Sequence, residues 1–162
     1  MISGSRSFRL PPPPALLSVP ALIGLEQFLN RALAGAMNSG ELEFLIARRL
    51  RICITNLSFS FDIGFDGRRL LLERSTGAAD LCIRGGSYEY LQLASRREDA
   101  DTLFFQRRLQ TEGDTELGLE VKNFLDGQDL SDQPMQHLLE TVLGSLAGAI
   151  EFCRRPRNTA ST

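Results

Sequence analysis

The sequence predicts an α+β domain in which helices cover a small, largely antiparallel sheet of about five strands. Three observations predict this class. Apolar residues recur at helical spacing in the first forty or so residues and again in the second half of the chain. Two central stretches alternate apolar and polar residues, as half-buried strands do. The pair Asp66-Gly67 then marks a tight turn into a further strand.

Length and composition favour one folded domain. A chain of 162 residues has the usual size of a single domain, and 43% hydrophobic with 23% charged residues is ordinary for a globular protein. The formal net charge of −2 argues against general nucleic-acid binding, which needs a basic surface. The three cysteines are far apart and form no CxxC pair, so we expect reduced thiols in a cytoplasmic protein.

The chain divides into an arm, a domain and a tail. We expect residues 1–19 to form a proline-rich arm, because Pro11–Pro14 favour an extended polyproline conformation. These prolines also stand where the helix of a secretion signal would begin, so we expect the arm to contact a membrane surface or a partner instead. We expect residues 20–153 to form the domain and residues 154–162 to be a polar, disordered tail.

The first helix is expected to run from Pro20 to about Asn38 and to stop at Gly40, because proline suits the first position of a helix. A short helical turn over residues 41–47 follows. Alternating residues then predict strands over 50–55 and 58–65, and an apolar run predicts another over 79–84.

A two-residue turn at Asp66-Gly67 would fix the register of the hairpin. It pairs Phe65 with Arg68, Ile63 with Leu70 and Phe61 with Leu72. The apolar residues of both strands then share one face, which we expect to face the core.

Capping residues mark the later helices. Ser87 is expected to cap a helix that runs to about residue 97, and Asp99 a short helix behind it. A strand over 107–112 leads to Gly113 and Asp114, and Asp114 caps a helix over 115–126. A last long helix, capped by Ser131 or Asp132, is expected over residues 133–153.

Catalytic patterns are absent from the sequence. We find no GxSxG, P-loop, HExxH or dinucleotide-binding motif. The single histidine, His137, lies between apolar neighbours on the last predicted helix, and its spacing from Cys53 and Cys82 supports no Cys–His pair. The paired acids, such as Asp99 with Asp101, fall at predicted helix starts, where capping explains them.

The elements carry much apolar surface for their size. The hairpin has a phenylalanine-rich face, and the helices predicted after residue 100 are strongly apolar. This surface forms either an ordinary core or a cavity between sheet and helices for a long apolar ligand. Composition does not choose between the two.

The stretch DTLFFQRRL at residues 101–109, followed by EGDTELGL at 112–119, resembles the sterol carrier protein type-two domain family. That family shows a short helix with an apolar-aromatic pair, a strand, and then Gly-Asp opening a helix. Residues 40–45 (GELEFL) and 18–20 (SVP) are similar to its bacterial members that assist oxygen-independent ubiquinone biosynthesis. The resemblance covers about residues 18–153.

The resemblance implies a five-stranded sheet covered by helices that enclose a lipid tunnel. We expect the domain to perform no catalysis and to need no cofactor or metal. The resemblance also implies a non-catalytic accessory factor that holds ubiquinone, its polyprenylated precursors or phospholipid for partner hydroxylases of the U32-peptidase-like class. We expect a cytoplasmic protein with transient contact to the inner membrane surface. Gly144 and Gly148 on the last helix permit a homodimer. The alternative function is a scaffold or membrane-recruitment module without a lipid cavity.

Gly113 and Asp114 are expected to be structural, as a tight turn and a helix cap. The side chains expected to line the tunnel are Phe61, Ile63, Leu72, Leu103, Phe104, Leu117, Val121, Phe124, Leu139 and Leu143.

Overall fold

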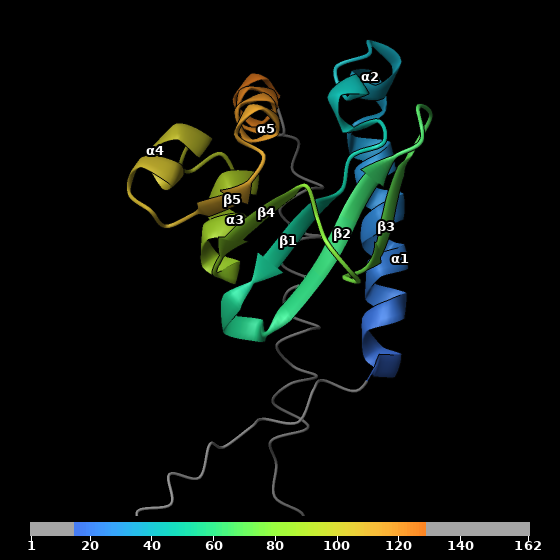
Figure 1. The fold of residues 1–162 in the computed structure, drawn as a ribbon, viewed down its shortest axis with the longest axis horizontal. Helices are drawn as coiled ribbons and strands as arrows, with labels where there is room; N and C mark the ends of the chain where they lie inside the picture. Colours follow the sequence, from blue (N-terminus) through green and yellow to red (C-terminus); the bar gives the residue numbers. More distant parts are fainter. Residues whose placement is uncertain (1–14, 129–162) are drawn as a thin grey trace, which may run out of the picture.

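The computed structural model describes residues 15–128 and the side chains from Val19 onward. It contains five helices, five strands and two short 3-10 turns, arranged as helices beside and behind one sheet (Figure 1). The elements are α1 (Ala15–Ala32), α2 (Ala34–Asn38), η1 (Glu43–Leu45), β1 (Leu50–Ile54), η2 (Thr55–Leu57), β2 (Phe59–Phe65), β3 (Leu70–Arg74), β4 (Leu81–Gly85), α3 (Ser87–Ala94), α4 (Ala100–Phe105), β5 (Gln110–Gly113) and α5 (Thr115–Gly127).

The sheet has the strand order β3-β2-β1-β4-β5. Every neighbouring pair is antiparallel except β1 and β4, which run parallel at the centre. A parallel pair needs a connection that crosses the sheet, and residues 75–80 provide it between β3 and β4. The predicted α+β class with a mostly antiparallel sheet is therefore confirmed, with one parallel pair that the sequence did not reveal.

The two faces of the sheet differ in polarity. The inner face is apolar: Ile52 of β1 pairs with Phe61 of β2 and with Ile83 of β4. The outer face is polar: Arg51 donates to both carboxylate oxygens of Asp62, at 2.7 and 3.0 Å. Burial raises the pKa of Asp62, but these hydrogen bonds outweigh burial and hold it below its usual value.

The crossing connection packs on the polar outer face. Arg51 donates to the carbonyl oxygens of Thr76 and Gly77, and Ser75 donates to Asp62. The charged groups of the sheet thus hold this connection in place. The inner face is left free to pack against helices.

The hairpin prediction was right about the shared face and wrong about the register. Phe65 pairs with Leu70 and Ile63 with Leu72, a shift of two residues that keeps all four side chains on one face. The carboxylate of Asp66 accepts the backbone N–H groups of Arg68 and Arg69, so the turn spans four residues. Gly67 has a φ of +91°, whereas the two-residue turn would also need positive φ at Asp66.

The first helix begins at Ala15, earlier than the predicted start at Pro20, and passes through the proline. The segment Ala15–Val19 contains alanine and two leucines, which favour a helix. Pro20 lacks a backbone N–H, but it lies near the start of the helix, so few backbone hydrogen bonds of the helix are lost. The helix breaks at Leu33, where ψ is 14°, and α2 continues from Ala34.

Two of the predicted caps are confirmed. Asp99 accepts the N–H of Thr102 at 2.6 Å, and Asp114 accepts the N–H of Leu117 at 3.0 Å. The predicted cap at Ser87 is wrong, because Ser87 is already helical and Gly86 is the N-cap. The cap predicted at Ser131 or Asp132 lies outside the described residues.

Asn56, far away in the sequence, supplies the missing cap of α3. Its amide oxygen accepts the N–H of Ser87 at 2.8 Å, and its amide nitrogen donates to the hydroxyl of the same serine at 2.8 Å. The last strand, β5, starts later than predicted, because the backbone at Arg107 turns through a φ of +57°. The last predicted helix, over residues 133–153, lies outside the described residues.

Gly113 and Asp114 join β5 to α5 as the sequence predicted. Gly113 has a φ of +122°, and a Cβ atom at this position would collide with the carbonyl oxygen of Asp80. That same oxygen accepts the N–H of Asp114 at 2.8 Å. The N–H of Leu117 and the guanidinium of Arg48, at 2.8 Å, hold the pKa of Asp114 below its usual value.

We predict that Gly113→Ala lowers the free energy of unfolding by about 3 kcal/mol, because the new methyl group meets both backbone strain and a fixed carbonyl oxygen. Urea unfolding followed by circular dichroism measures the change. The matched control is Gly24→Ala inside α1, where no atom lies within 4 Å of the new Cβ. The control should gain about 0.5–1 kcal/mol. Equal stability of parent and Gly113→Ala would contradict this account of the turn.

Candidate functional site

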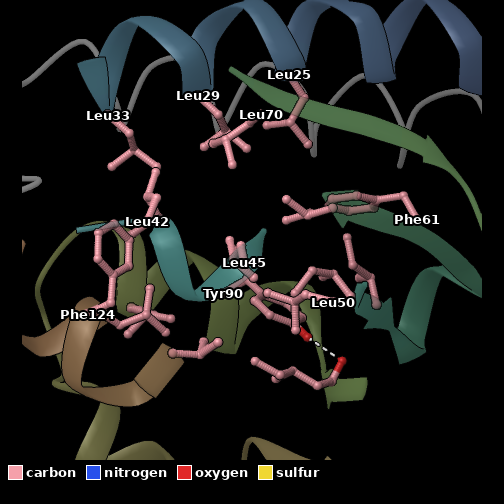
Figure 2. Close-up of a pocket in the computed structure, with 18 of the residues that line it drawn as sticks. Leu25, Leu29, Leu33, Leu42, Leu45, Leu50, Phe61, Leu70, Tyr90 and Phe124 are labelled. Carbon is pink, nitrogen blue, oxygen red and sulfur yellow. Dashed lines mark hydrogen bonds between the residues drawn. The ribbon is translucent and has the colours of Figure 1, made fainter. Parts of the chain in front are cut away.

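An apolar cavity lies between the inner face of the sheet and helices α1, α3 and α5 (Figure 2). Its volume is about 230 Å³. The lining consists of aliphatic and aromatic side chains from five parts of the fold. They are Ala21, Leu22, Leu25 and Leu29 from α1, with Leu33 directly after it; Leu42, Phe44 and Leu45 around η1; Leu50, Ile52, Ile54, Phe59, Phe61, Ile63, Leu70 and Ile83 from the sheet; Tyr90, Leu93 and Ala94 from α3; and Val121, Phe124 and Leu125 from α5.

One wall of the cavity is a leucine stripe on α1. Leu22, Leu25, Leu29 and Leu33 are three or four residues apart, so they project from one side of the helix. Figure 2 shows Leu25 and Leu29 of α1, and Leu33 directly after the helix, pointing into the cavity. Three of the four are at most 9% exposed, and Leu29 is partly buried.

Polar side chains hold α1 beside the edge of the sheet. The N–H of Leu72 in β3 donates to the Glu26 carboxylate at 2.8 Å. The N–H of Leu70 donates to the Asn30 side-chain oxygen at 2.8 Å, and the Asn30 amide donates back to the Leu70 carbonyl at 2.9 Å. We call these three the edge hydrogen bonds. They satisfy backbone groups that an edge strand otherwise leaves unpaired.

Aromatic rings stand at separate parts of the cavity wall. Phe44 of η1 and Phe124 of α5 have ring centroids 5.9 Å apart, with their planes at 58°. Phe59 and Phe61 of β2 have centroids 5.8 Å apart. Such tilted pairs are favourable, so the rings are fixed by each other as well as by the core.

Tyr90 is the lining residue with a polar atom in its side chain, and that atom is directed to the backbone. Its hydroxyl donates to the carbonyl oxygen of Ile83 at 3.0 Å (Figure 2). Burial raises the pKa of Tyr90, so the phenol stays neutral and is a poor acid or base. The cavity can therefore bind apolar groups, and its described walls supply no group for general acid–base work.

The predicted tunnel residues fall into three sets. Phe61, Ile63, Val121 and Phe124 line the cavity. The second set lies in or against the buried core without lining the cavity, and comprises Leu72, Leu103, Phe104 and Leu117. Leu139 and Leu143 lie outside the described residues.

Sequence reasoning missed the α1 wall and the segment around η1. The leucine stripe of α1 was visible as a helical pattern, but the pattern alone assigns it to the core. Nothing in the sequence indicated that α1 faces the sheet across a cavity. That placement depends on Glu26 and Asn30, whose partners are backbone groups 46 and 40 residues away in the sequence.

The cysteines of β1 and β4 lie on the outer face of the sheet, away from the cavity. The Sγ atoms of Cys53 and Cys82 are 3.2 Å apart. Burial, with the neighbouring Cys53, raises the pKa of Cys82 to about 11, so it is a neutral thiol near pH 7 and a weak nucleophile. Within residues 15–128, no group of three or more histidine, cysteine or acidic residues could hold a metal ion.

A second hollow of about 490 Å³ lies on the polar side of the sheet near β2. Two of its carboxylates already have partners: Asp62 accepts from Arg51, and Asp80 accepts the N–H of Arg49 at 2.7 Å. Although this hollow is larger, it is a weaker candidate site than the apolar cavity. No described helix is both long and apolar enough to span a membrane.

Comparisons with known proteins agree on one family. The model of the SCP-2 sterol transfer family matches residues 25–126. The "Ubiquinone biosynthesis accessory factor UbiT" of Escherichia coli strain K12 is 38% identical over 146 residues, which cover 85% of this chain and 82% of that protein. The UbiT protein of Escherichia coli O157:H7 matches with the same figures.

A solved structure shares the fold. The "UbiJ-SCP2 Ubiquinone synthesis protein" superposes with a TM-score of 0.56 over 67% of this chain and 96% of that one. Its sequence identity is 20%, so this likeness supports the architecture alone.

Proposed function

Because the chain belongs to the SCP-2 sterol transfer family, we propose that it is a non-catalytic, lipid-binding accessory factor of ubiquinone biosynthesis. In this function it holds ubiquinone, a polyprenylated precursor or a phospholipid by its apolar chain. The identity to UbiT over most of both chains supports the pathway. The apolar cavity between α1 and the sheet is the observation that supports lipid binding.

The chemistry of the cavity fits an apolar chain. Burying a methylene group stabilises binding by about 0.8 kcal/mol, so a chain of several isoprene units gains enough without any polar contact. The described walls offer no hydrogen-bonding side chain to a quinone ring. We therefore propose that the chain of the lipid enters the cavity while its ring stays at the rim.

A ring at the rim is accessible to other enzymes. We propose that partner hydroxylases of the U32-peptidase-like class, acting without oxygen, modify the ring while this protein shields the tail. The accessory factor itself then needs no catalytic residue. Phe61, Ile63, Val121 and Phe124 are the sequence-predicted residues proposed to touch the tail.

We also propose transient contact with the inner membrane surface through the first part of α1. Val19 and Ile23 project from this helix with 44% and 54% of their surface exposed. The expected arm before them contains arginines at 6 and 9 and no acidic residue. Exposed apolar side chains next to a basic segment suit an anionic bilayer surface.

The lipid-binding proposal predicts that organic extraction of the purified full-length protein releases a lipid with a long apolar chain, identified by mass spectrometry. Ala94→Phe adds a ring inside the cavity and should reduce the extracted lipid at least fivefold. Ala32→Phe, at the exposed end of α1, is the matched control and should leave it unchanged. Extracts free of isoprenoid and phospholipid would overturn the proposal and favour a scaffold.

The membrane proposal predicts weaker co-sedimentation of the pair Val19→Ser and Ile23→Ser with vesicles of phosphatidylethanolamine and phosphatidylglycerol. The apolar contact is lost, so we expect at least a threefold drop in the bound fraction. Ile46→Ser, which removes an equally exposed isoleucine from another surface, is the control. Binding that is the same in all variants would show that α1 does not contact the bilayer.

A further inference from the structure

The walls of the cavity differ in how firmly polar bonds hold them. The strands are held by continuous backbone pairing. Helix α3 is held by the Asn56 cap and by the Tyr90 hydroxyl. Helix α5 is held by its Asp114 cap, with Arg48, and by the hydrogen bond of Ala100 to Asp126.

Among the residues that the structure describes, those that bind α1 through polar groups lie on one side of it. Its described polar attachment to the sheet consists of the three edge hydrogen bonds from Glu26 and Asn30 to β3. Figure 1 shows α1 running along the outside of β3, at the border of the sheet. The rest of its inner face is the leucine stripe, which faces the cavity and which an apolar ligand can contact equally well.

The chain also has a point about which α1 could turn. The helix is interrupted at Leu33, and α2 after it is fixed by the buried Ala36. Two exposed small residues, Ala34 and Gly35, follow the interruption. Hinges commonly use a few residues at the end of an element, where a change of backbone angle displaces few contacts.

We propose that α1 is a hinged wall of the cavity, and that a long apolar chain enters and leaves between α1 and β3 when the edge hydrogen bonds open. This inference rests on the proposed lipid-binding function and adds the route of entry. Glu26 and Asn30 are positioning residues: they keep the wall closed and do not touch the ligand. The pivot is the interruption at Leu33.

If the ligand passes between α1 and β3, the edge hydrogen bonds affect the rates of ligand entry and exit more than the affinity for the ligand. The edge hydrogen bonds are present before and after the ligand enters and are broken while it passes, so weakening them should speed entry and exit alike. A hydrogen bond to a charged group is stronger than a neutral one, so the bond to the Glu26 carboxylate should contribute the largest share of the barrier. Loss of all three should accelerate both steps by at least tenfold.

The first test is stopped-flow binding of the fluorescent polyene fatty acid cis-parinaric acid to the full-length protein. The pair Glu26→Met and Asn30→Leu keeps the side-chain size and removes every acceptor and donor. We expect association and dissociation rate constants at least tenfold higher, with a Kd within threefold of the parent. Gln27→Met, on the exposed side of α1, is the control and should behave as the parent. Glu26→Gln keeps an acceptor oxygen but loses the charge, so its rate constants should lie between those of the parent and the double variant.

Unchanged rate constants in the double variant would overturn the proposal. A higher dissociation rate alone, with a correspondingly weaker Kd, would also overturn it, because the bonds would then stabilise the bound state rather than control entry. Either result would leave the lipid-binding function standing.

The second test needs no ligand and no variant. Leu70 and Leu72 donate their N–H groups to α1, whereas Leu71 between them pairs with Gly64 of β2. Hydrogen exchange followed by NMR should show the Leu70 and Leu72 amides exchanging together, at least tenfold faster than Leu71. Equal protection of all three amides would overturn the hinge, whether or not the protein binds the fatty acid. A protein that binds no fatty acid would contradict the proposed lipid-binding function, and the exchange experiment would still test the hinge.

Discussion

The position of α1 is the constraint on which the cavity depends. A helix with a leucine stripe would normally pack directly on an apolar sheet face, and that packing would leave no cavity. Here Glu26 and Asn30 bind the backbone of β3 and keep the helix at the border of the sheet. The leucines of α1 therefore face Ile52, Phe61 and their neighbours across a space of about 230 Å³. The same contacts satisfy the free edge of β3, which would otherwise be able to pair with another chain.

The division of polarity across the sheet separates the residues that hold the fold from those that line the cavity. The outer face carries the charged network of Arg51 and Asp62, which holds the connection from β3 to β4. The thiols of Cys53 and Cys82 are on this side as well. The inner side is left to apolar groups, and the one phenol there, Tyr90, is bound to the Ile83 carbonyl. This arrangement suits a carrier, whose binding energy comes from buried carbon, better than an enzyme, which needs charged or nucleophilic groups at the ligand.

The sequence predicted what depends on local chemistry. The caps Asp99 and Asp114, the turn at Gly113 and the shared face of the β2–β3 hairpin are confirmed. Features set by distant partners could not be predicted. The cap of α3 comes from Asn56, and the hairpin register depends on how the Asp66 carboxylate binds Arg68 and Arg69. Of the side chains that line the cavity, Phe61, Ile63, Val121 and Phe124 were predicted from the sequence, whereas the α1 leucines were recognised only as a helical pattern. Only the tertiary contacts of Glu26 and Asn30 distinguish a helix that packs on the sheet from one that faces it across a cavity.

The central claim is that the space between α1 and the sheet is where the ligand binds. The most direct measurement is an NMR experiment on protein with ¹³C-labelled isoleucine, leucine and valine methyl groups, loaded with a short-chain ubiquinone. The account predicts nuclear Overhauser effects from the isoprenoid chain to Leu25, Leu29, Ile52 and Ile83, which line the cavity. Contacts confined to exposed methyl groups such as those of Ile46 and Leu119, with none in the cavity, would contradict it.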